Sequence, residues 1–91
     1  MSQNTQNPYF YTLDASIPDI LEVVGATSVS IFAETDTCRV ANMDTGQEMY
    51  IPLGTTMDLN PDSGNTLATL NISPTSGFAY VVMIGGVAQL I

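Results

Sequence analysis

Cationic side chains are almost absent from this sequence. It contains no Lys and no His, and its single Arg faces nine carboxylates, so the formal net charge at pH 7 is −8. Contacts to nucleic-acid phosphates depend on Lys and Arg, so the composition argues against binding to DNA or RNA. Anionic membrane surfaces attract basic segments for the same reason. We therefore expect neither nucleic acid nor membrane among its partners.

The residues that most enzymes use as nucleophiles and bases are also missing. Without His or Lys, the Ser–His, Cys–His and Lys-based mechanisms cannot be assembled. Cys38 is the only cysteine, so it has no disulfide partner within the chain, and a lone Cys usually packs as a small apolar residue. Glu34 with Asp36, and Asp19 with Glu22, are possible carboxylate pairs, but glycoside hydrolysis needs them across a substrate cleft. We expect a solvated acidic surface, no enzyme activity and no cofactor.

No segment has the pattern of a secretion signal or of a membrane span. The first ten residues, MSQNTQNPYF, lack a basic region followed by an apolar one. No residue after Asp62 is charged, yet the apolar stretch at residues 77–91 is shorter than the roughly 20 residues that a span requires. Gly85 and Gly86 also interrupt it. We expect a protein that is made and assembled in a cytoplasm.

Alternation of apolar and polar residues is the main structural signal. In SVSIFAE, residues 28–34, Val29, Ile31 and Ala33 lie on one face, and only Phe32 breaks the polar face. This period of two is typical of a half-buried strand. The pattern predicts an all-β protein.

Turn signals divide the chain into short segments. They are DTG at 44–46, PDSG at 61–64 and PTSG at 74–77. About eight short strands with this spacing predict a small antiparallel β-sandwich or barrel, jelly-roll-like or immunoglobulin-like. We expect an extended, flexible N-terminal arm over residues 1–8 and a single β domain over residues 9–91.

Residues 14–25, DASIPDILEVVG, fit two interpretations. Pro18 suits an early helical position and Gly25 a helix end, whereas Val23 and Val24 favour a strand. A short helical turn and a short strand both remain open for this segment.

One loop carries the spacing of a calcium site. Asp58, Asn60 and Asp62 alternate before Gly64, as the oxygen ligands do at the start of a calcium-binding loop. However, Gly64 comes one position late and the twelfth position holds Thr69 instead of Glu. The alternative is a plain turn between strands, in which Pro61 is preset for the second turn position. These three residues are the candidate metal ligands.

Aromatic side chains provide a second possible binding site. A sugar-binding platform on one sandwich face could use several of them, although packing in a core or an interface is the commoner use. The residues concerned are Tyr9, Phe10, Tyr11, Tyr50 and Phe78.

The segment FAYVVMI, residues 78–84, is apolar on both faces of a strand. A strand of this kind is normally covered on both faces, but a thin sandwich covers only one. The cover of the other face could be another subunit, the N-terminal arm or a larger assembly, and this need for cover is the main reason to expect oligomerisation. The candidate interface residues are Tyr9, Phe10, Tyr11, Phe78, Tyr80, Val81, Val82, Met83, Ile84, Leu90 and Ile91.

Residues 27–86 resemble a family of small β-sandwich proteins. The segments TSVSIFAE, TCRVANMDTGQEMYIPLG and FAYVVMIGG resemble virion structural proteins of tailed bacteriophages, of the capsid decoration or cement type. The resemblance implies a non-enzymatic protein that is located in the virion after assembly in the host cytoplasm. The resemblance also implies that its partners would be its own copies, in a trimer or dimer, and the major capsid protein. The alternative function is a small carbohydrate- or calcium-binding β-sandwich module.

Overall fold

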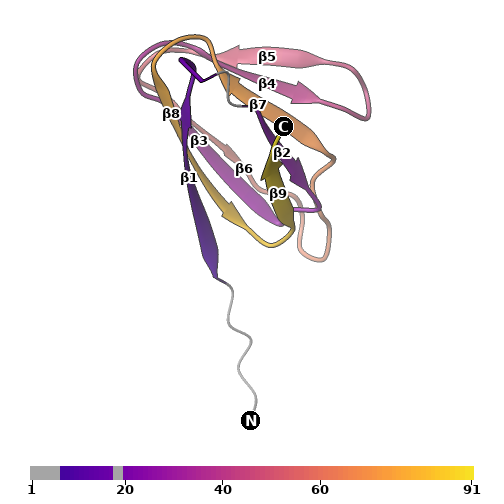
Figure 1. The fold of residues 1–91 in the computed structure, drawn as a ribbon. Coiled ribbons are helices and arrows are strands. Elements are labelled where there is room, and N and C mark those ends of the chain that lie inside the picture. The colour runs from indigo at the N-terminus through magenta and orange to yellow at the C-terminus, as the bar shows by residue number, and fades with distance from the viewer. Residues whose placement is uncertain (1–6, 18–19) are drawn as a thin grey trace.

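The computed structural model describes residues 7–17 and 20–91, and in this part of the chain every regular element is a β-strand. The expected arm lies mostly outside the described residues, as do Pro18 and Asp19. Figure 1 shows the strands, whose bounds are β1 Pro8–Asp14, β2 Leu21–Val24, β3 Ser28–Ala33, β4 Cys38–Asn42, β5 Glu48–Ile51, β6 Thr56–Leu59, β7 Leu70–Pro74, β8 Phe78–Ile84 and β9 Val87–Leu90.

The strands form two antiparallel sheets that pack face to face, so the predicted small β-sandwich is confirmed. The four-stranded sheet has the order β1-β8-β3-β6, and the five-stranded sheet has the order β5-β4-β7-β2-β9. The central pairings connect distant parts of the chain, because β8 lies between β1 and β3, and β7 lies between β4 and β2. No helix in the described residues has the length and apolar character that a membrane span requires.

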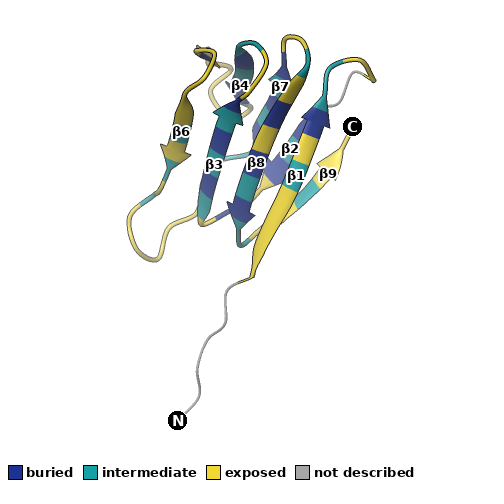
Figure 2. Ribbon diagram, turned by 90° about the vertical axis from the view of Figure 1, so that its left-hand side faces the viewer, coloured by how far each residue is buried: buried dark blue, intermediate teal, exposed yellow. Residues whose placement is uncertain are grey.

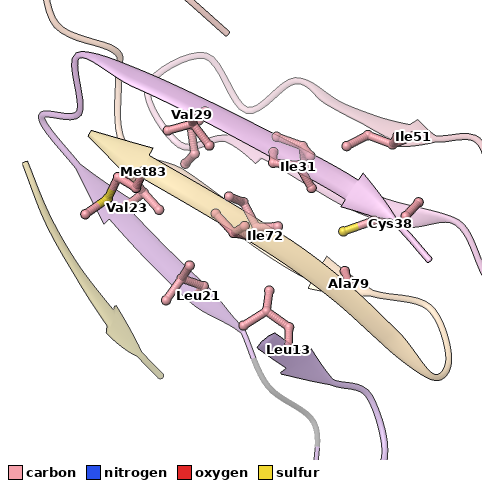
Figure 3. Close-up of a cluster of buried hydrophobic side chains, with 14 of the residues drawn as sticks. Leu13, Leu21, Val23, Val29, Ile31, Cys38, Ile51, Ile72, Ala79 and Met83 are labelled. Atoms are coloured by element: carbon pink, nitrogen blue, oxygen red, sulfur yellow. The ribbon is translucent and has the colours of Figure 1, made fainter. Parts of the chain in front are cut away.

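The core lies between the two sheets and consists of the inward residues of each strand. In β3 and β8, buried residues alternate with more exposed ones, as the period of two requires. Val29 and Ile31 of β3 lie opposite Ile72 of β7 and Val23 of β2 (Figure 3). No polar or charged residue is buried among the described residues. Burial of each such aliphatic side chain stabilises the fold by about 1.5–3 kcal/mol.

The segment with two possible interpretations forms a strand. Leu21 and Val23 of β2 are buried and alternate with the more exposed Glu22 and Val24. β2 pairs with β7 on one side and with β9 on the other, so it lies inside the five-stranded sheet. Hydrogen bonding to two neighbours outweighs the weak helical preference of so short a segment.

The DTG turn at 44–46 forms the expected hairpin between β4 and β5. Gly46 has a φ of 78°, in the left-handed region that glycine adopts readily. The Gly46 amide donates to the Asn42 carbonyl at 2.8 Å, and the Asp44 amide donates to Asn42 Oδ1 at 2.9 Å. The turn therefore has both the backbone conformation and the side-chain acceptor that it needs.

Candidate functional site

The outward side of the four-stranded sheet carries a continuous set of large apolar residues. Strand register places them in adjacent rows: Phe10 of β1 pairs with Val82 of β8, and Tyr80 of β8 pairs with Phe32 of β3. Figure 2 shows β8 with buried residues alternating with more exposed ones, and β1 exposed over its first half. We define the outer apolar face as Phe10, Phe32, Phe78, Tyr80, Val82 and Ile84.

Several of these side chains are open to solvent. Phe10 is 73% exposed, Phe78 is 42% exposed and Tyr80 is 41% exposed. The rings of Phe32 and Tyr80 stack across neighbouring strands, with centroids 6.3 Å apart and planes 5° from parallel. Cross-strand aromatic pairs of this kind contribute to the stability of the sheet. A contiguous exposed apolar surface on a soluble domain is a usual mark of an interaction site.

Carboxylates lie at the margin of the outer apolar face. Asp14 pairs with Phe78 at one end, and Asp58 of β6 accepts a hydrogen bond from Ser30 Oγ at one side. Ser16 donates to Asp14 Oδ1 through its hydroxyl at 2.7 Å and its amide at 2.9 Å, and these two bonds lower the pKa of Asp14. The margin is therefore negatively charged at neutral pH.

Arg39, the only Lys or Arg residue in the sequence, does not neutralise this margin. Arg39 lies on β4, in the five-stranded sheet, where its Nε donates to Glu48 Oε2 of β5 at 2.8 Å. The ion pair is a diagonal cross-strand contact, because Arg39 is opposite Tyr50 and Glu48 is opposite Ala41 in the β4–β5 register. The outer apolar face therefore has an apolar centre and an acidic border.

The structure divides the predicted interface residues among different surfaces. Five of them, Phe10, Phe78, Tyr80, Val82 and Ile84, belong to the outer apolar face, and the exposed Leu90 and Ile91 lie at and after the end of β9 in the other sheet. Val81 and Met83 are each 1% exposed, because alternation along β8 directs them into the core of the chain itself. These two side chains are not accessible to another subunit, which corrects the prediction.

The predicted β1 tyrosines do not belong to the outer face. Tyr9 and Tyr11 pair with the inward Met83 and Val81, and Tyr11 packs against the core. Phe32 was not among the predicted interface residues. The sequence feature that could have identified Phe32 is the apolar residue that interrupts the polar face of residues 28–34. At that position β3 contributes to the outer apolar face.

The five aromatic residues proposed for a sugar platform do not form a single surface. Phe10 and Phe78 lie on the outer apolar face, whereas Tyr9 and Tyr11 lie on the opposite side of β1. Tyr50 is on β5 of the five-stranded sheet. The aromatic group that the structure does assemble combines Phe10 and Phe78 with Phe32 and Tyr80.

The candidate metal ligands do not form a charged cluster. Asp58 lies on β6, and the exposed Asn60 and Asp62 follow it in the loop. Over the described residues, no group of three or more His, Cys, Asp or Glu side chains is placed to hold a metal ion.

Asp36 of the proposed Glu34–Asp36 pair takes part in loop structure. It accepts hydrogen bonds from the Thr37 amide at 2.7 Å and from Ser76 Oγ at 2.8 Å. These bonds, the Thr37 amide first, lower the pKa of Asp36. Glu34 accepts from the Thr35 hydroxyl. The hydrogen bonds of Asp36 join the loop after β3 to the loop before β8.

A second apolar surface lies at the other side of the sandwich, between the edge strands β5 and β6. It is a groove of about 470 Å³ lined chiefly by Met49, Met57, Leu59, Leu67 and Leu70. Met49 is 50% exposed there. The groove lies beside the buried core residues Val40 and Leu70, which also line it.

Comparisons of this chain with protein-family models, with curated proteins and with solved structures found no match.

Proposed function

We propose that this protein is a non-enzymatic structural protein that acts by assembling with other subunits through the outer apolar face. The observation that carries the proposal is the row of exposed Phe10, Phe78 and Tyr80 beside Val82 on two paired strands. Such a surface costs free energy in water and is stabilised when a partner covers it.

Burial of apolar surface would supply the binding free energy. A stable interface of standard size covers about 800 Å² on each partner, and each buried Å² of apolar surface contributes about 25 cal/mol before the costs of association. A small sheet face provides one modest contact. Repetition of that contact over a symmetric lattice strengthens the attachment of each subunit without any new contact.

The setting that we propose is a tailed-phage virion, in which the protein decorates or cements the capsid by contacting the major capsid protein. This part of the proposal is supported by the resemblance of residues 27–86 to decoration and cement proteins. The acidic border formed by Asp14 and Asp58 suits a capsid surface with Lys or Arg around an apolar centre.

The observation that favours a second function is the aromatic group itself. Phe32 and Tyr80 stack in parallel, with Phe10 and Phe78 exposed on the same face. Flat aromatic surfaces of this kind also bind the apolar faces of sugar rings. A carbohydrate-binding module is therefore the second candidate function.

Co-sedimentation with capsid shells tests the first proposal. The shells would be assembled from the major capsid protein of a tailed phage. The double variant F78S/Y80S removes two exposed rings from the outer apolar face, so we expect its shell affinity to fall at least about tenfold. The matched control is Tyr50→Ser, because Tyr50 is 51% exposed but lies on the other sheet.

Two results would contradict the assembly proposal. One is wild-type protein that stays in the supernatant at all shell concentrations, and the other is equal binding by wild type and the double variant. Retention of the wild type on a glycan array, lost in F78S/Y80S and kept in Tyr50→Ser, would favour the carbohydrate function instead.

A further inference from the structure

The edge strand β1 differs from the other strands that end the two sheets. β1 is 7 residues long, whereas β5, β6 and β9 are each 4 residues long. All seven residues of β1 pair in an unbroken register with β8, so no bulge twists the strand away. Short length, bulges, Pro and Lys are the usual protections of an edge strand. β5 ends just before Pro52, but β1 has Pro only at its first residue.

The hydrogen-bond pattern identifies the backbone groups that β1 leaves open. The Ala15 amide donates to the Gly77 carbonyl at 2.8 Å, which extends the β1–β8 ladder by one pair. In an antiparallel ladder, alternate residues bond to the neighbouring strand. The odd-numbered residues of β1 therefore bond to β8, and the even-numbered Phe10 and Thr12 direct their amides and carbonyls to the open edge.

The side chains along this edge are uncharged and partly exposed. Residues 8–13 contain no charged side chain in a protein whose net charge is −8. Tyr9 is 50% exposed and Phe10 is 73% exposed, at the half of β1 that Figure 2 shows in the colour of exposed residues. An uncharged strand does not repel an identical strand, whereas the acidic surfaces elsewhere would.

We propose that β1 pairs antiparallel with β1 of a second copy, which joins the two four-stranded sheets into one sheet across a two-fold axis. In the register centred on Tyr11, Phe10 of each copy exchanges hydrogen bonds with Thr12 of the other. The two Asp14 carboxylates then lie about 20 Å apart, since each is opposite Pro8 of the other copy. This separation exceeds the Debye length of about 8 Å at physiological salt.

The pairing also extends the candidate assembly surface. Phe10 and Thr12 both lie on the outward side of β1, so the outer apolar faces of the two copies join on one side of the combined sheet. The inference rests on the proposed assembly function and deepens it: the unit that meets a partner is a dimer with a doubled apolar face. It also gives the exposed Tyr9 a neighbour, Leu13 of the second copy.

Sedimentation velocity of the full chain over a concentration series tests the proposal. Thr12→Pro removes an amide that points to the open edge and leaves the β8 ladder intact, and Pro is tolerated on edge strands. We expect its dimer dissociation constant to rise at least about tenfold. Thr12→Val is the matched control, because it keeps the amide and the β-branched shape, and it should remain dimeric.

Three further variants keep the test decisive. If Thr12→Pro does not fold, Thr12→Lys replaces it, because a charge at this edge opposes strand pairing without removing an amide. Tyr11→Cys tests the register. In the proposed pairing residue 11 of one copy lies opposite residue 11 of the other, so this variant should form a cross-linked dimer under mild oxidation. Thr12→Cys should cross-link far more slowly, and the native Cys38 is buried and does not interfere.

The outcomes separate this inference from the proposed function. F78S/Y80S should remain dimeric while it loses shell binding, and Thr12→Pro should lose the dimer. A wild type that is monomeric at about 100 µM overturns β1 pairing, as does a dimer that Thr12→Pro and Thr12→Lys leave unchanged. Either result leaves the shell-binding test of the assembly function standing.

Discussion

Cys38 is a free thiol whose chemistry is set by its burial. It is fully buried in the core on β4, and desolvation raises its pKa to about 11. In the unfolded chain a thiol has an ordinary pKa of about 8.5. Ionisation of Cys38 therefore favours the unfolded chain as the pH rises above about 8.5, and the native protein keeps a neutral, unreactive thiol.

We expect the Cys38 thiol to be almost inert toward a disulfide reagent such as DTNB in the native protein at pH 8. Unfolding in urea should restore rapid reaction of one thiol per chain. Equal rates of thiol reaction with and without urea would show that Cys38 is accessible to the reagent in the native protein.

Gly77 is a residue whose replacement the structure forbids on two grounds. Its φ is 67°, and an added Cβ would lie 2.3 Å from Thr35 Cβ. We expect Gly77→Ala to lower the free energy of unfolding by about 2 kcal/mol or more, measured by urea denaturation.

Gly46→Ala is the control for the Gly77 prediction. Gly46 also has a positive φ, 78°, but nothing lies within 4 Å of its added Cβ. In this variant the free energy of unfolding should fall only by the cost of the left-handed backbone conformation, about 1 kcal/mol. If the two variants lose equal stability, contact with Thr35 has no role.

At the scale of the element, the two sides of β8 are both apolar because each side contacts a different environment. Ala79, Val81 and Met83 fill the core, while Tyr80 and Val82 belong to the outer apolar face. Adjacent valines on one strand therefore have different roles, one in the stability of the chain and the other in its surface.

This difference predicts unequal effects of the same substitution. Val81→Ala should lower the free energy of unfolding by about 2 kcal/mol, because it removes two buried methyl groups and leaves a cavity. Val82→Ala, on the outer face, should lower it by less than about 1 kcal/mol. Urea denaturation of both variants checks the prediction, and a larger loss for Val82→Ala would reverse the assigned faces of β8.

Local patterns predicted the elements better than their partners. Alternation over residues 28–34 predicted β3, and the DTG turn predicted the β4–β5 hairpin, because each depends on neighbouring residues. The pairing of β1 with β8 joins segments about 70 positions apart, and register over such a distance is set by the whole core. For the same reason the sequence alone could not assign Phe32 to the outer apolar face, because that assignment depends on the pairing of β3 with β8.

At the scale of the whole molecule, charge opposes self-association and apolar contact favours it. Two copies with a net charge of −8 each repel one another, and salt screens this repulsion. We expect the dimer dissociation constant to fall several-fold between about 20 mM and 300 mM NaCl, measured by sedimentation. A rise in the dissociation constant with salt would instead indicate an interface held by ion pairs.

The strand order has a consequence for folding during synthesis on the ribosome. The centre of each sheet, β8 in one and β7 in the other, comes from the last third of the sequence. Until those strands are synthesised, β1 and β2 have no neighbour, and the earlier segments can form only the β4–β5 hairpin and the β3–β6 pair. We therefore expect most of the fold to form late in synthesis, once β7 and β8 are available to pair.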